Sequence, residues 1–434
     1  MPLVQVLYRT LLRGFRLVSP AMMWGSSKLS HGLRGRRDAH NILIEWGESV
    51  RDPDQPVVWI HASSVGEALQ AKAVLDALRE RLPDLQVVFT FFSPSAELLV
   101  EHFPADISAY LPWDLPEVVG KILDAVCPVL VVFTQKEVWP SLAAAAVGRG
   151  VPVVLVAATL TRAAGRLSRR GKVLLGPTFR GLQCVAAISE ADGERFELLD
   201  VPQDRIVVTG DPGVDYASGR AAEADPSVTY LKLFRDSTGP VLVAGSTWSS
   251  DEDVLIPALA RLRRDRPDLR VVFAPHEPEG WDFDGLGSRL SADGWSPTLL
   301  NEAEDRGRLD GADAILVERV GVLAELYTVA SIAYVGGGFH GHGLHSVLEP
   351  AAAGAPVVFG PQHQNSLAAS HLLACGAARM VTDSDALIAT LEEWLADSEK
   401  LREHGRRALD YIGEHRGAAG RTADLLVESL SEQE

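Results

Sequence analysis

The sequence contains little of what stabilises small secreted or metal-bound folds. Its 434 residues include three cysteines and four methionines. The cysteines, Cys127, Cys184 and Cys375, are widely spaced in apolar surroundings, so they predict neither a disulfide framework nor a zinc site. A reducing compartment fits this usage best.

Positive charge is also scarce, because the net charge is -17 at pH 7. Phosphate backbones are bound by Lys and Arg, so this balance argues against nucleic acid as the main partner. Acidic residues are in turn missing before Asp38, where seven basic residues stand. The pattern predicts a basic arm attached to an acidic body.

No apolar run of the arm is long enough to span a membrane, because arginines interrupt it. These arginines lie within the apolar part and no small-residue cleavage site follows, which is unlike a signal peptide. From Leu3 to Val18, apolar residues recur at helical spacing. A helix lying in anionic headgroups explains both features, and an amphipathic helix packed on the protein body is the alternative.

Short β-branched runs alternate with amphipathic stretches twice along the chain, and its length suits two domains. Nearly continuous apolar runs are typical of parallel strands that are covered on both faces. We therefore expect two doubly wound α/β domains. The predicted strands are 57–60, 87–91, 129–133, 153–156, 184–187 and 206–209 in the first half, and 241–244, 271–274, 314–317, 332–335, 357–359 and 380–381 in the second.

The domain limits follow from this alternation. Residues 218–240 are polar, mixed in charge and without a strong apolar period, so they are the predicted linker. Ligands of open α/β sheets bind outside the carboxyl ends of the strands, which predicts a site between the two domains. The expected order is the basic arm over 1–40, a domain over 41–217, the linker, a domain over 241–410, and a helix over 411–434 that could pack on the first domain.

A carboxylate stands where the first predicted strand meets the next helix, in the stretch HASSVGE, residues 61–67. We expect Ser63 to Gly66 to form a tight turn and Glu67 to open the helix. Helix N-terminal amides favour an ionised carboxylate, so Glu67 is expected to be unprotonated near neutral pH and able to accept a proton. The alternative is a glutamate that only caps its own helix.

A second carboxylate, Glu137 in FTQKEVWP, follows the strand predicted over 129–133. Alone it indicates a structural role, in which its hydrogen bonds hold a neighbouring loop.

Cations gather in a region of the first half without acidic residues. Arginine binds phosphate through two parallel hydrogen bonds, so this group suits a phosphorylated acceptor. A solvated helix face is the alternative. The tight group consists of Arg162, Arg166, Arg169, Arg170 and Lys172.

Three loops of the second half have the residues of a phosphate or nucleotide site. Ser246 and Thr247 stand between a strand and a helix, where hydroxyls and free amides can hold a phosphate. The glycine run over 336–343 would let the backbone approach a ligand closely, and Glu349 could accept hydrogen bonds from a ribose. His276 could point into the same site or be a structural histidine. No P-loop pattern is present.

Three histidines, His340, His342 and His345, lie in or beside the glycine run. No carboxylate or cysteine is spaced to complete a ligand set, and glycine loops hold ligands poorly, so we expect no metal.

Eight motifs in order resemble the Kdo transferases of lipopolysaccharide assembly: HASSVGE, FFSPSAE, KEVWP, ISEADGERF, AGSTWSSDED, APHEPE, YVGGGF and GLHSVLEPAAAGAPVVFGP. The similarity extends from the N-terminal arm to about Arg379. It implies a two-domain GT-B fold and an inverting transfer of Kdo from CMP-Kdo to a lipid A precursor of the lipid IVA type. It also implies peripheral or monotopic attachment to the cytoplasmic face of the bacterial inner membrane, with an anionic surface as partner and no cofactor besides the donor.

The resemblance also implies roles for residues. Glu67 matches the proposed general base of the family, and Glu137 matches a second important carboxylate; both are predicted catalytic residues. The predicted donor-binding residues of the second domain are Ser246, Thr247, His276, Gly337, Gly338, His345, Ser346, Glu349 and Asn365. The predicted acceptor-binding residues of the first domain are Ser63, Ser64, Ser93, Ser95, Arg162, Arg166, Arg169, Arg170 and Lys172.

Three positions depart from the family pattern. Gly213 replaces a lysine, Ser346 replaces the usual Asn, and Gln135 replaces an acidic residue. These changes bear on nucleotide binding and acceptor handling, and none alters the predicted base. Two alternatives stay open: another GT-B nucleotide-sugar transferase or epimerase, and a noncatalytic lipid A-binding protein on the same scaffold.

Overall fold

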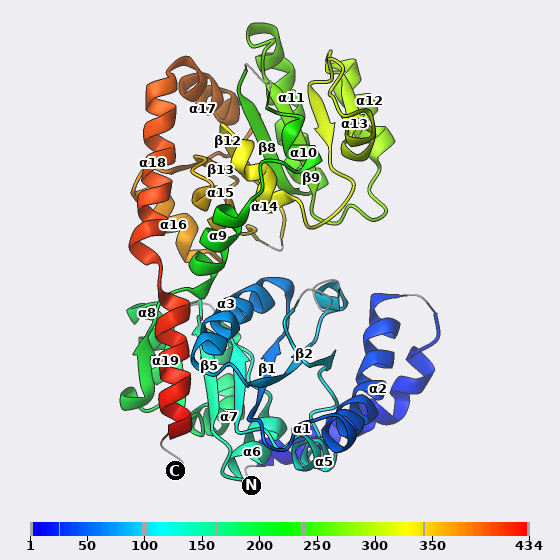
Figure 1. Cartoon of the computed structure of the whole chain (residues 1–434), viewed down its shortest axis with the longest axis vertical. Helices are drawn as coiled ribbons and strands as arrows, with labels where there is room; N and C mark the ends of the chain where they lie inside the picture. Colours follow the sequence, from blue (N-terminus) through cyan, green and yellow to red (C-terminus); the bar gives the residue numbers. More distant parts are fainter. Residues whose placement is uncertain are drawn as a thin grey trace. The chain divides into compact units, whose positions relative to one another are not determined.

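The computed structural model describes residues 3–25, 27–97, 103–161, 164–235, 239–341 and 343–431 (Figure 1). The chain forms two compact units. Unit 1 consists of Met1–Tyr216 and Arg416–Glu434, and unit 2 consists of Ala217–His415.

Unit 1 is built on a seven-stranded parallel sheet with the order β3-β2-β1-β4-β5-β6-β7. The inner strands β1, β2, β4 and β5 are buried at every residue, as continuous apolar runs predict. The strands are β1 Val57–Ala62, β2 Gln86–Phe91, β3 Ile107–Tyr110, β4 Leu130–Thr134, β5 Val153–Ala158, β6 Cys184–Ala187 and β7 Ile206–Val208. The helices are α1 Leu3–Met22, α2 Lys28–Ser49, α3 Val65–Arg81, α5 Pro116–Val126, α6 Pro140–Val147, α7 Arg169–Arg180, α8 Glu190–Glu197 and α19 Ala418–Ser431, with short 3-10 turns η1 Pro94–Ala96, η2 Gly165–Leu167 and η3 Gln203–Arg205.

The basic arm forms two helices, and the second continues past the expected limit at residue 40. Helix α2 packs on α5 and β3, and its Leu43 and Trp46 lie in the core of unit 1. Helix α1 is held at Tyr8, whose hydroxyl donates to Asp114 Oδ2 at 2.9 Å. Within the described residues, no helix is long and apolar enough to cross a membrane.

Unit 2 has a second seven-stranded parallel sheet, with the order β10-β11-β9-β8-β12-β13-β14. Two parallel α/β sheets confirm the predicted fold class. The strands are β8 Val241–Thr247, β9 Arg270–Pro275, β10 Pro297–Leu299, β11 Ala314–Leu316, β12 Ile332–Val335, β13 Val357–Phe359 and β14 Ala378–Met380. The helices are α10 Thr229–Lys232, α11 Ser249–Asp265, α12 Phe283–Ala292, α13 Leu300–Arg306, α14 Leu323–Leu326, η4 Tyr327–Val329, α15 Leu348–Ala352, α16 Leu367–Ala374, α17 Ser384–Ala396 and α18 Ser398–His415.

The two strands that the sequence did not predict, β3 and β10, each lie at the edge of their sheet. Edge strands are short and partly exposed, so they lack a continuous apolar run. Strand β3 is only half buried, and β10 begins with Pro297, which an edge tolerates.

The segment 218–240, predicted as a linker, is part of unit 2. It contains the end of α9, Pro212–Glu223, and all of α10. Leu231, Leu233 and Phe234 are buried in the core of unit 2. Because only these apolar side chains are needed to anchor a short helix, the segment shows no strong period.

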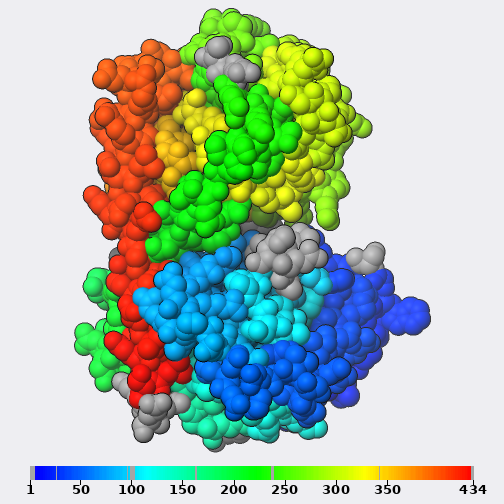
Figure 2. Space-filling view, viewed as in Figure 1, coloured from blue at the N-terminus to red at the C-terminus, as the bar shows by residue number. Residues whose placement is uncertain are grey.

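The last helix, α19, packs against α3 within unit 1, and Figure 2 shows the red surface of α19 beside the blue of α3. Arg421 Nε donates to Thr209 O at 2.9 Å, and Thr422 Oγ1 donates to Thr209 Oγ1 at 3.0 Å. Ala423 and Leu426 join the core.

Candidate active site

Glu67 lies in the first turn of α3, directly after β1. The helix begins at Val65, two residues earlier than expected, with Ser64 as the N-cap that accepts from the Glu67 N–H at 3.4 Å. Glu67 Oε2 in turn accepts the Ser63 N–H at 2.7 Å. Residues 63–66 are therefore a helix cap and first turn rather than a separate tight turn, and the capping interpretation describes part of what Glu67 does.

Glu67 is only 4% exposed, which changes its expected protonation. Burial raises its pKa to about 7, against the lowering effect of the Ser63 N–H, and the nearby charge of Glu137 raises it further. The expectation of a fully ionised carboxylate at neutral pH is therefore wrong, because desolvation outweighs the helix-start amides. A carboxylate with this pKa can take up and release a proton near neutrality.

Ser63 connects Glu67 to the second predicted carboxylate. Its backbone N–H serves Glu67, while its Oγ donates to Glu137 Oε2 at 2.8 Å. Arg166 Nη2 lies 3.3 Å from Glu137 Oε1. The β1–α3 loop, the β4–α6 loop and η2 thus bring three predicted residues around one serine.

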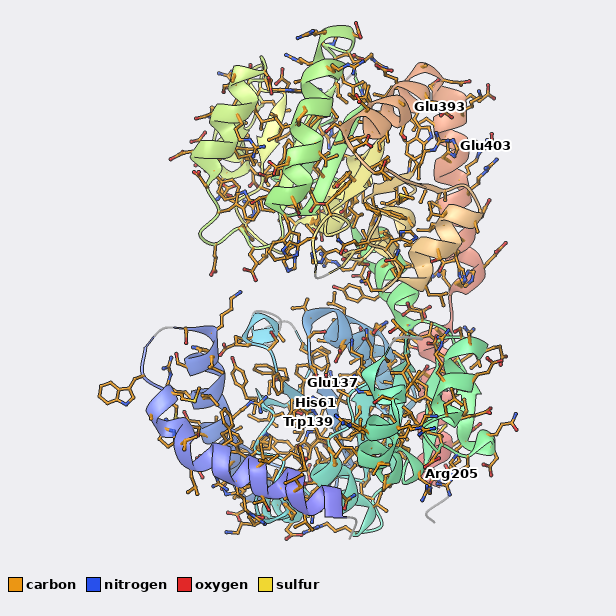
Figure 3. The ribbon with its side chains drawn as sticks, turned by 180° about the vertical axis from the view of Figure 1, so that it is seen from behind. His61, Glu137, Trp139, Arg205, Glu393 and Glu403 are labelled. Carbon is orange, nitrogen blue, oxygen red and sulfur yellow. The ribbon has the colours of Figure 1, made fainter. Side chains whose placement is uncertain are left out.

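Two neighbouring residues, His61 and Trp139, were not predicted as site residues (Figure 3). Trp139 Nε1 donates to His61 Nε2 at 3.1 Å, which leaves Nδ1 to donate to Thr90 Oγ1 at 3.1 Å. Burial lowers the pKa of His61 to about 3, so the ring is neutral. Because His61 Nε2, 3.2 Å from Ser63 Oγ, already accepts the indole proton, the Ser63 proton is directed to Glu137.

An arginine of the basic arm, Arg36 of α2, also reaches this region. Its guanidinium lies 3.7 Å from the ring centroid of Phe92 and 5.9 Å from that of Trp139. Burial lowers its pKa to about 10. Arg36 Nη2 is buried without a hydrogen-bond partner in the described part of the chain. Arg36 could be identified as a neighbour of this site only from the packing of α2, because in the sequence it stands among the arginines of the basic arm.

The other predicted acceptor residues lie in several settings. Ser93 adjoins the site through its backbone, because its N–H donates to Ser63 O at 3.1 Å. Arg169 and Arg170 are exposed and Lys172 is half-buried in the first turn of α7, where no acidic residue stands. Arg162 and the side chain of Ser95 lie outside the described residues.

Two of the departures from the family pattern meet at one buried carboxyl group. Gln135 Nε2 donates to Gln70 Oε1 at 2.8 Å, and Gln70 Nε2 donates to Asp211 Oδ1 at 2.8 Å. The Gly213 N–H donates to the same oxygen at 2.8 Å. Burial raises the pKa of Asp211. An uncharged Gln135 suits this chain of amides better than a further carboxylate would.

In unit 2, Ser246 and Thr247 are the last residues of strand β8, which continues three residues beyond its predicted end at residue 244. Ser246 has φ 54°, a left-handed conformation that is uncommon for a residue with a side chain. Thr247 is fully buried, and its Oγ1 has no hydrogen-bond partner among the residues described. The His276 N–H, after β9, donates to Thr247 O at 3.0 Å and ties the two loops together.

Asp251 fixes the loop that follows. Its Oδ2 accepts the N–H groups of Trp248 and Gly337, each at 2.9 Å, and its Oδ1 accepts the hydroxyl of Tyr334 at 2.9 Å. Asp251 was not among the predicted site residues, although it stands in the AGSTWSSDED motif.

Trp248 and three histidines form an aromatic cluster. The Trp248 and His340 rings stack at 4.3 Å, and the His276 and His345 centroids are 4.1 Å apart. Trp248 Nε1 donates to His345 Nε2 at 3.0 Å. The fold thus brings together His276 and His345, two predicted donor residues. Among the residues described, no group of three or more His, Cys, Asp or Glu side chains is arranged to hold a metal, and His342 lies outside them.

The glycine run packs against protein backbone. A Cβ at Gly336 would meet Ser246 O, at Gly337 it would meet Gly343 O, and at Gly338 it would meet the backbone of Gly360. Glycine is therefore required at these three positions because neighbouring loops approach each other closely. The sequence had suggested close approach of the backbone to a ligand as the reason.

The other predicted donor residues lie beside this run in different settings. The helix after the glycine run was expected to begin near residues 344–346, but α15 begins at Leu348, and the exposed Ser346 accepts the Leu348 N–H at 3.3 Å. Asn365 is bonded to Leu344 N and O, at 3.1 and 2.8 Å, and so holds the loop. Glu349 lies in the first turn of α15, and burial raises its pKa.

Comparison with known proteins gives one consistent result. A family model described as 3-deoxy-D-manno-octulosonic-acid transferase (kdotransferase) matches residues 40–215. The 3-deoxy-D-manno-octulosonic acid transferase of Bordetella pertussis is 30% identical, over 86% of this chain and 87% of the relative. The enzyme of the same name from Haemophilus influenzae is 26% identical over the same shares, 86% and 87%.

Solved structures resemble the fold at low identity. The UDP-GlcNAc 2-epimerase from Neisseria meningitidis superposes with a TM-score of 0.58 at 14% identity, covering 87% of this chain and all (100%) of that one. The UDP-GlcNAc 2-epimerase from Methanocaldococcus jannaschii gives 0.55 at 15% identity, over 87% and 99%. These structures support the two-domain GT-B architecture and carry no conclusion about activity.

Proposed function

We propose a reaction from the premise that this chain belongs to the 3-deoxy-D-manno-octulosonic acid (Kdo) transferase family, and so is a Kdo glycosyltransferase of lipopolysaccharide biosynthesis. The proposed donor is CMP-Kdo and the proposed acceptor is a lipid A precursor of the lipid IVA type. Transfer is a single displacement with inversion at the anomeric carbon.

The proposed general base is Glu67. It takes the proton of an acceptor hydroxyl while the hydroxyl oxygen forms a bond to the anomeric carbon. The bond from that carbon to the CMP phosphate oxygen breaks, and CMP leaves with the electron pair. The observation that carries this role is the burial of Glu67, whose pKa of about 7 suits a base that works near neutrality.

Glu137 is proposed to contact the acceptor and to help keep Glu67 basic. Its negative charge raises the pKa of Glu67, and the hydrogen bond from Ser63 holds it in place. The neutral His61 and Trp139 orient Ser63, so they are positioning residues.

On the donor side, the proposed phosphate contacts are the Ser246–Thr247 loop and the Trp248, His276 and His345 cluster. The unpartnered hydroxyl of Thr247 supports a polar ligand at this loop. Charge develops on one phosphate as CMP leaves, and amide and hydroxyl donors stabilise it. A single phosphate needs metal bridging less than a diphosphate does.

Incubation with CMP-Kdo and purified lipid IVA, followed by mass spectrometry of the lipid, tests the reaction. We expect a product heavier by whole Kdo residues and the release of CMP. Lipid binding without CMP release would instead support a noncatalytic lipid A-binding protein. Stabilisation by UDP rather than CMP in a thermal shift assay would favour a different nucleotide-sugar enzyme.

Arg169, Arg170 and Lys172 are proposed to bind the acceptor phosphates. Three cations in a first turn are unfavourable for the helix dipole, which a bound anion would correct. Reversing Arg169 or Arg170 to Glu should raise the acceptor KM and leave CMP binding unchanged. Arg264→Glu, an exposed reversal in unit 2, is the control, and a loss of CMP binding in the α7 variants would contradict the assignment.

Attachment to an anionic inner-membrane surface is proposed for α1. Leu7, Leu11, Leu17 and Val18 are exposed on this helix next to its arginines. Replacing Leu7, Leu11 and Leu17 by Ser should release the protein from vesicles containing anionic lipid. Leu198→Ser is the control, because Leu198 is an exposed leucine at the end of α8. Unchanged vesicle binding by the triple variant would refute the attachment.

A further inference from the structure

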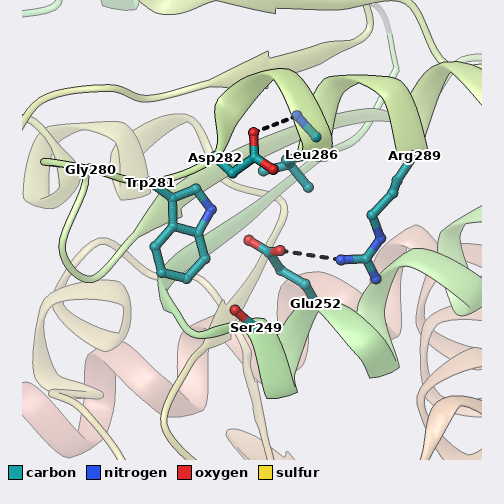
Figure 4. Close-up of a pocket in the computed structure, with 8 residues that line it drawn as sticks. Ser249, Glu252, Gly280, Trp281, Asp282, Leu286 and Arg289 are labelled. Atoms are coloured by element: carbon teal, nitrogen blue, oxygen red, sulfur yellow. Dashed lines mark hydrogen bonds and ion pairs between the residues drawn. The ribbon is translucent and has the colours of Figure 1, made fainter.

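A polar pocket of about 330 Å³ lies in unit 2, where the first turn of α11 faces the loop before α12 and the helix itself (Figure 4). Its lining includes Ser249, Glu252, Trp281, Asp282, Leu286 and Arg289. None of these residues belongs to the donor or acceptor sets above. The volume is in the range of small-molecule sites.

Glu252 is the feature that points to a ligand. It is 3% exposed, its Oε1 has no hydrogen-bond partner among the described residues, and its side chain faces the pocket. Oε2 lies 3.6 Å from Arg289 Nη1. Burial raises the pKa of Glu252 to about 7, against the lowering effects of the Arg289 charge and the Trp281 indole. A buried carboxylate oxygen without a donor is unfavourable, and hydroxyl groups of a ligand would supply the donors.

The charges around the pocket argue against an anionic group bound within it. Glu252 and Asp282 line it together with one cation, and Arg289 also pairs with Asp253 at 3.0 Å. Its guanidinium in turn disfavours an ammonium ligand. A neutral group that both donates and accepts hydrogen bonds satisfies Glu252, Arg289 and the Ser249 hydroxyl.

Trp281 further limits the chemical class of the ligand. Its half-buried indole lines one side of the pocket, with the ring nitrogen turned toward Glu252 (Figure 4). An aromatic face packs on the apolar C–H surface of a sugar, while a carboxylate accepts hydrogen bonds from two adjacent hydroxyls.

We infer that this pocket binds a vicinal diol of a sugar through Glu252, with Trp281 as its apolar wall. Two sources have this chemistry. One is the hydroxylated chain of the Kdo group carried by the donor, an assignment that rests on the proposed function. The other is a separate neutral sugar. Helix α11 begins two residues after Thr247, so the pocket adjoins the loop assigned to the donor.

Saturation-transfer NMR tests the inference. It measures the binding of free Kdo and of methyl α-D-mannopyranoside to the full chain. The variant Glu252→Gln keeps the side-chain volume and removes the carboxylate, and Trp281→Leu removes the aromatic wall. We expect each variant to weaken probe binding about ten-fold or more. Glu392→Gln, an exposed carboxylate of α17, is the matched control and should bind as the wild type does.

The two probes separate the sources. Weakened binding of Kdo alone assigns the diol to the donor, weakened binding of the mannoside alone assigns it to a separate sugar, and weakened binding of both supports the shared chemistry. Wild-type protein that binds neither probe, or variants that bind as tightly as wild type, would overturn the inference. CMP binding is measured on the same samples, so a failure of the proposed donor is seen separately. Trp281 lies on a loop, so we expect Trp281→Leu to fold. This variant therefore tests the pocket even where Glu252→Gln does not fold.

Discussion

The two units place a buried carboxylate at the same point, the third residue of the helix that follows their first strand. It is Glu67 in α3 and Asp251 in α11. Asp251 accepts hydrogen bonds from Trp248, Gly337 and Tyr334, whereas the one hydrogen bond that Glu67 accepts from described residues is that of Ser63. Position alone therefore does not distinguish a structural carboxylate from the proposed base, and the two differ in the number of hydrogen bonds that they accept.

Removing Glu67, the proposed base, should have the largest effect. Glu67→Gln keeps the acceptor for the Ser63 N–H but cannot take a proton. We expect kcat with CMP-Kdo and lipid IVA to fall about 10²- to 10⁴-fold, with CMP binding retained. Turnover close to that of the wild type would remove Glu67 from the base role.

Removing the structural carboxylate should instead affect stability. Asp251→Ala leaves the buried Tyr334 hydroxyl and the Gly337 N–H without a partner, and we expect the free energy of unfolding to fall by about 3 kcal/mol. Denaturant unfolding measures this loss. Asp265→Ala, at the exposed end of α11, is the control, and equal stabilities of the two variants would count against the comparison.

The raised pKa of Glu67 predicts a pH dependence. Since the base must be unprotonated, kcat/KM should fall about ten-fold for each pH unit below about 7 and level off above it. The steep limb should disappear in the residual activity of Glu67→Gln. A profile that turns near pH 4.5, the ordinary value, would show that burial does not control this group.

The same shift affects stability with a defined sign. The folded state binds the Glu67 proton more tightly than the unfolded state, so this group's contribution to the free energy of unfolding falls as the pH rises from about 4.5 to about 7. Glu67→Gln should then be more stable than the wild type at pH 8, by at most about 3 kcal/mol. Equal stability at pH 5 and pH 8 relative to wild type would contradict the shift.

Ser63 should give the smallest effect. Ser63→Ala removes the hydroxyl that holds Glu137 and keeps the backbone N–H that serves Glu67. We expect kcat/KM to fall by roughly 3- to 10-fold, as for the loss of one hydrogen bond. The matched variant Ser64→Ala removes the N-cap of α3 and should lower stability by about 1 kcal/mol instead. The reverse pattern would exchange the roles of the two serines.

Inner strands and edge strands differ in how well the sequence revealed them. The fully buried β1, β2, β4 and β5 were predicted within two residues at each end, because both faces of a central parallel strand demand apolar side chains. Strands β3 and β10 were missed, since an edge relaxes that demand. The helix starts were also shifted: α3 begins earlier than expected and α15 later.

The site residues also differ in whether the sequence could identify them. Glu67 and Glu137 could be placed at strand ends from their motifs, and the fold joins them through Ser63. His61 and Trp139 stand in the same motifs, yet nothing local shows that Trp139 donates to His61 across 78 positions of sequence. Arg36 and Asp251 depend in the same way on which element packs beside them.

The sequence by itself determined the alternating α/β pattern, the order of the family motifs and the position of Glu67 at a strand end, because these depend on neighbouring residues and their periodicity. Only the tertiary structure decided the state of that carboxylate. Its solvation and the approach of Glu137 come from residues some seventy positions away, brought together when the parallel strands pair. Desolvation and charge act through space, and their balance raises the pKa of Glu67 where the local helix alone would lower it.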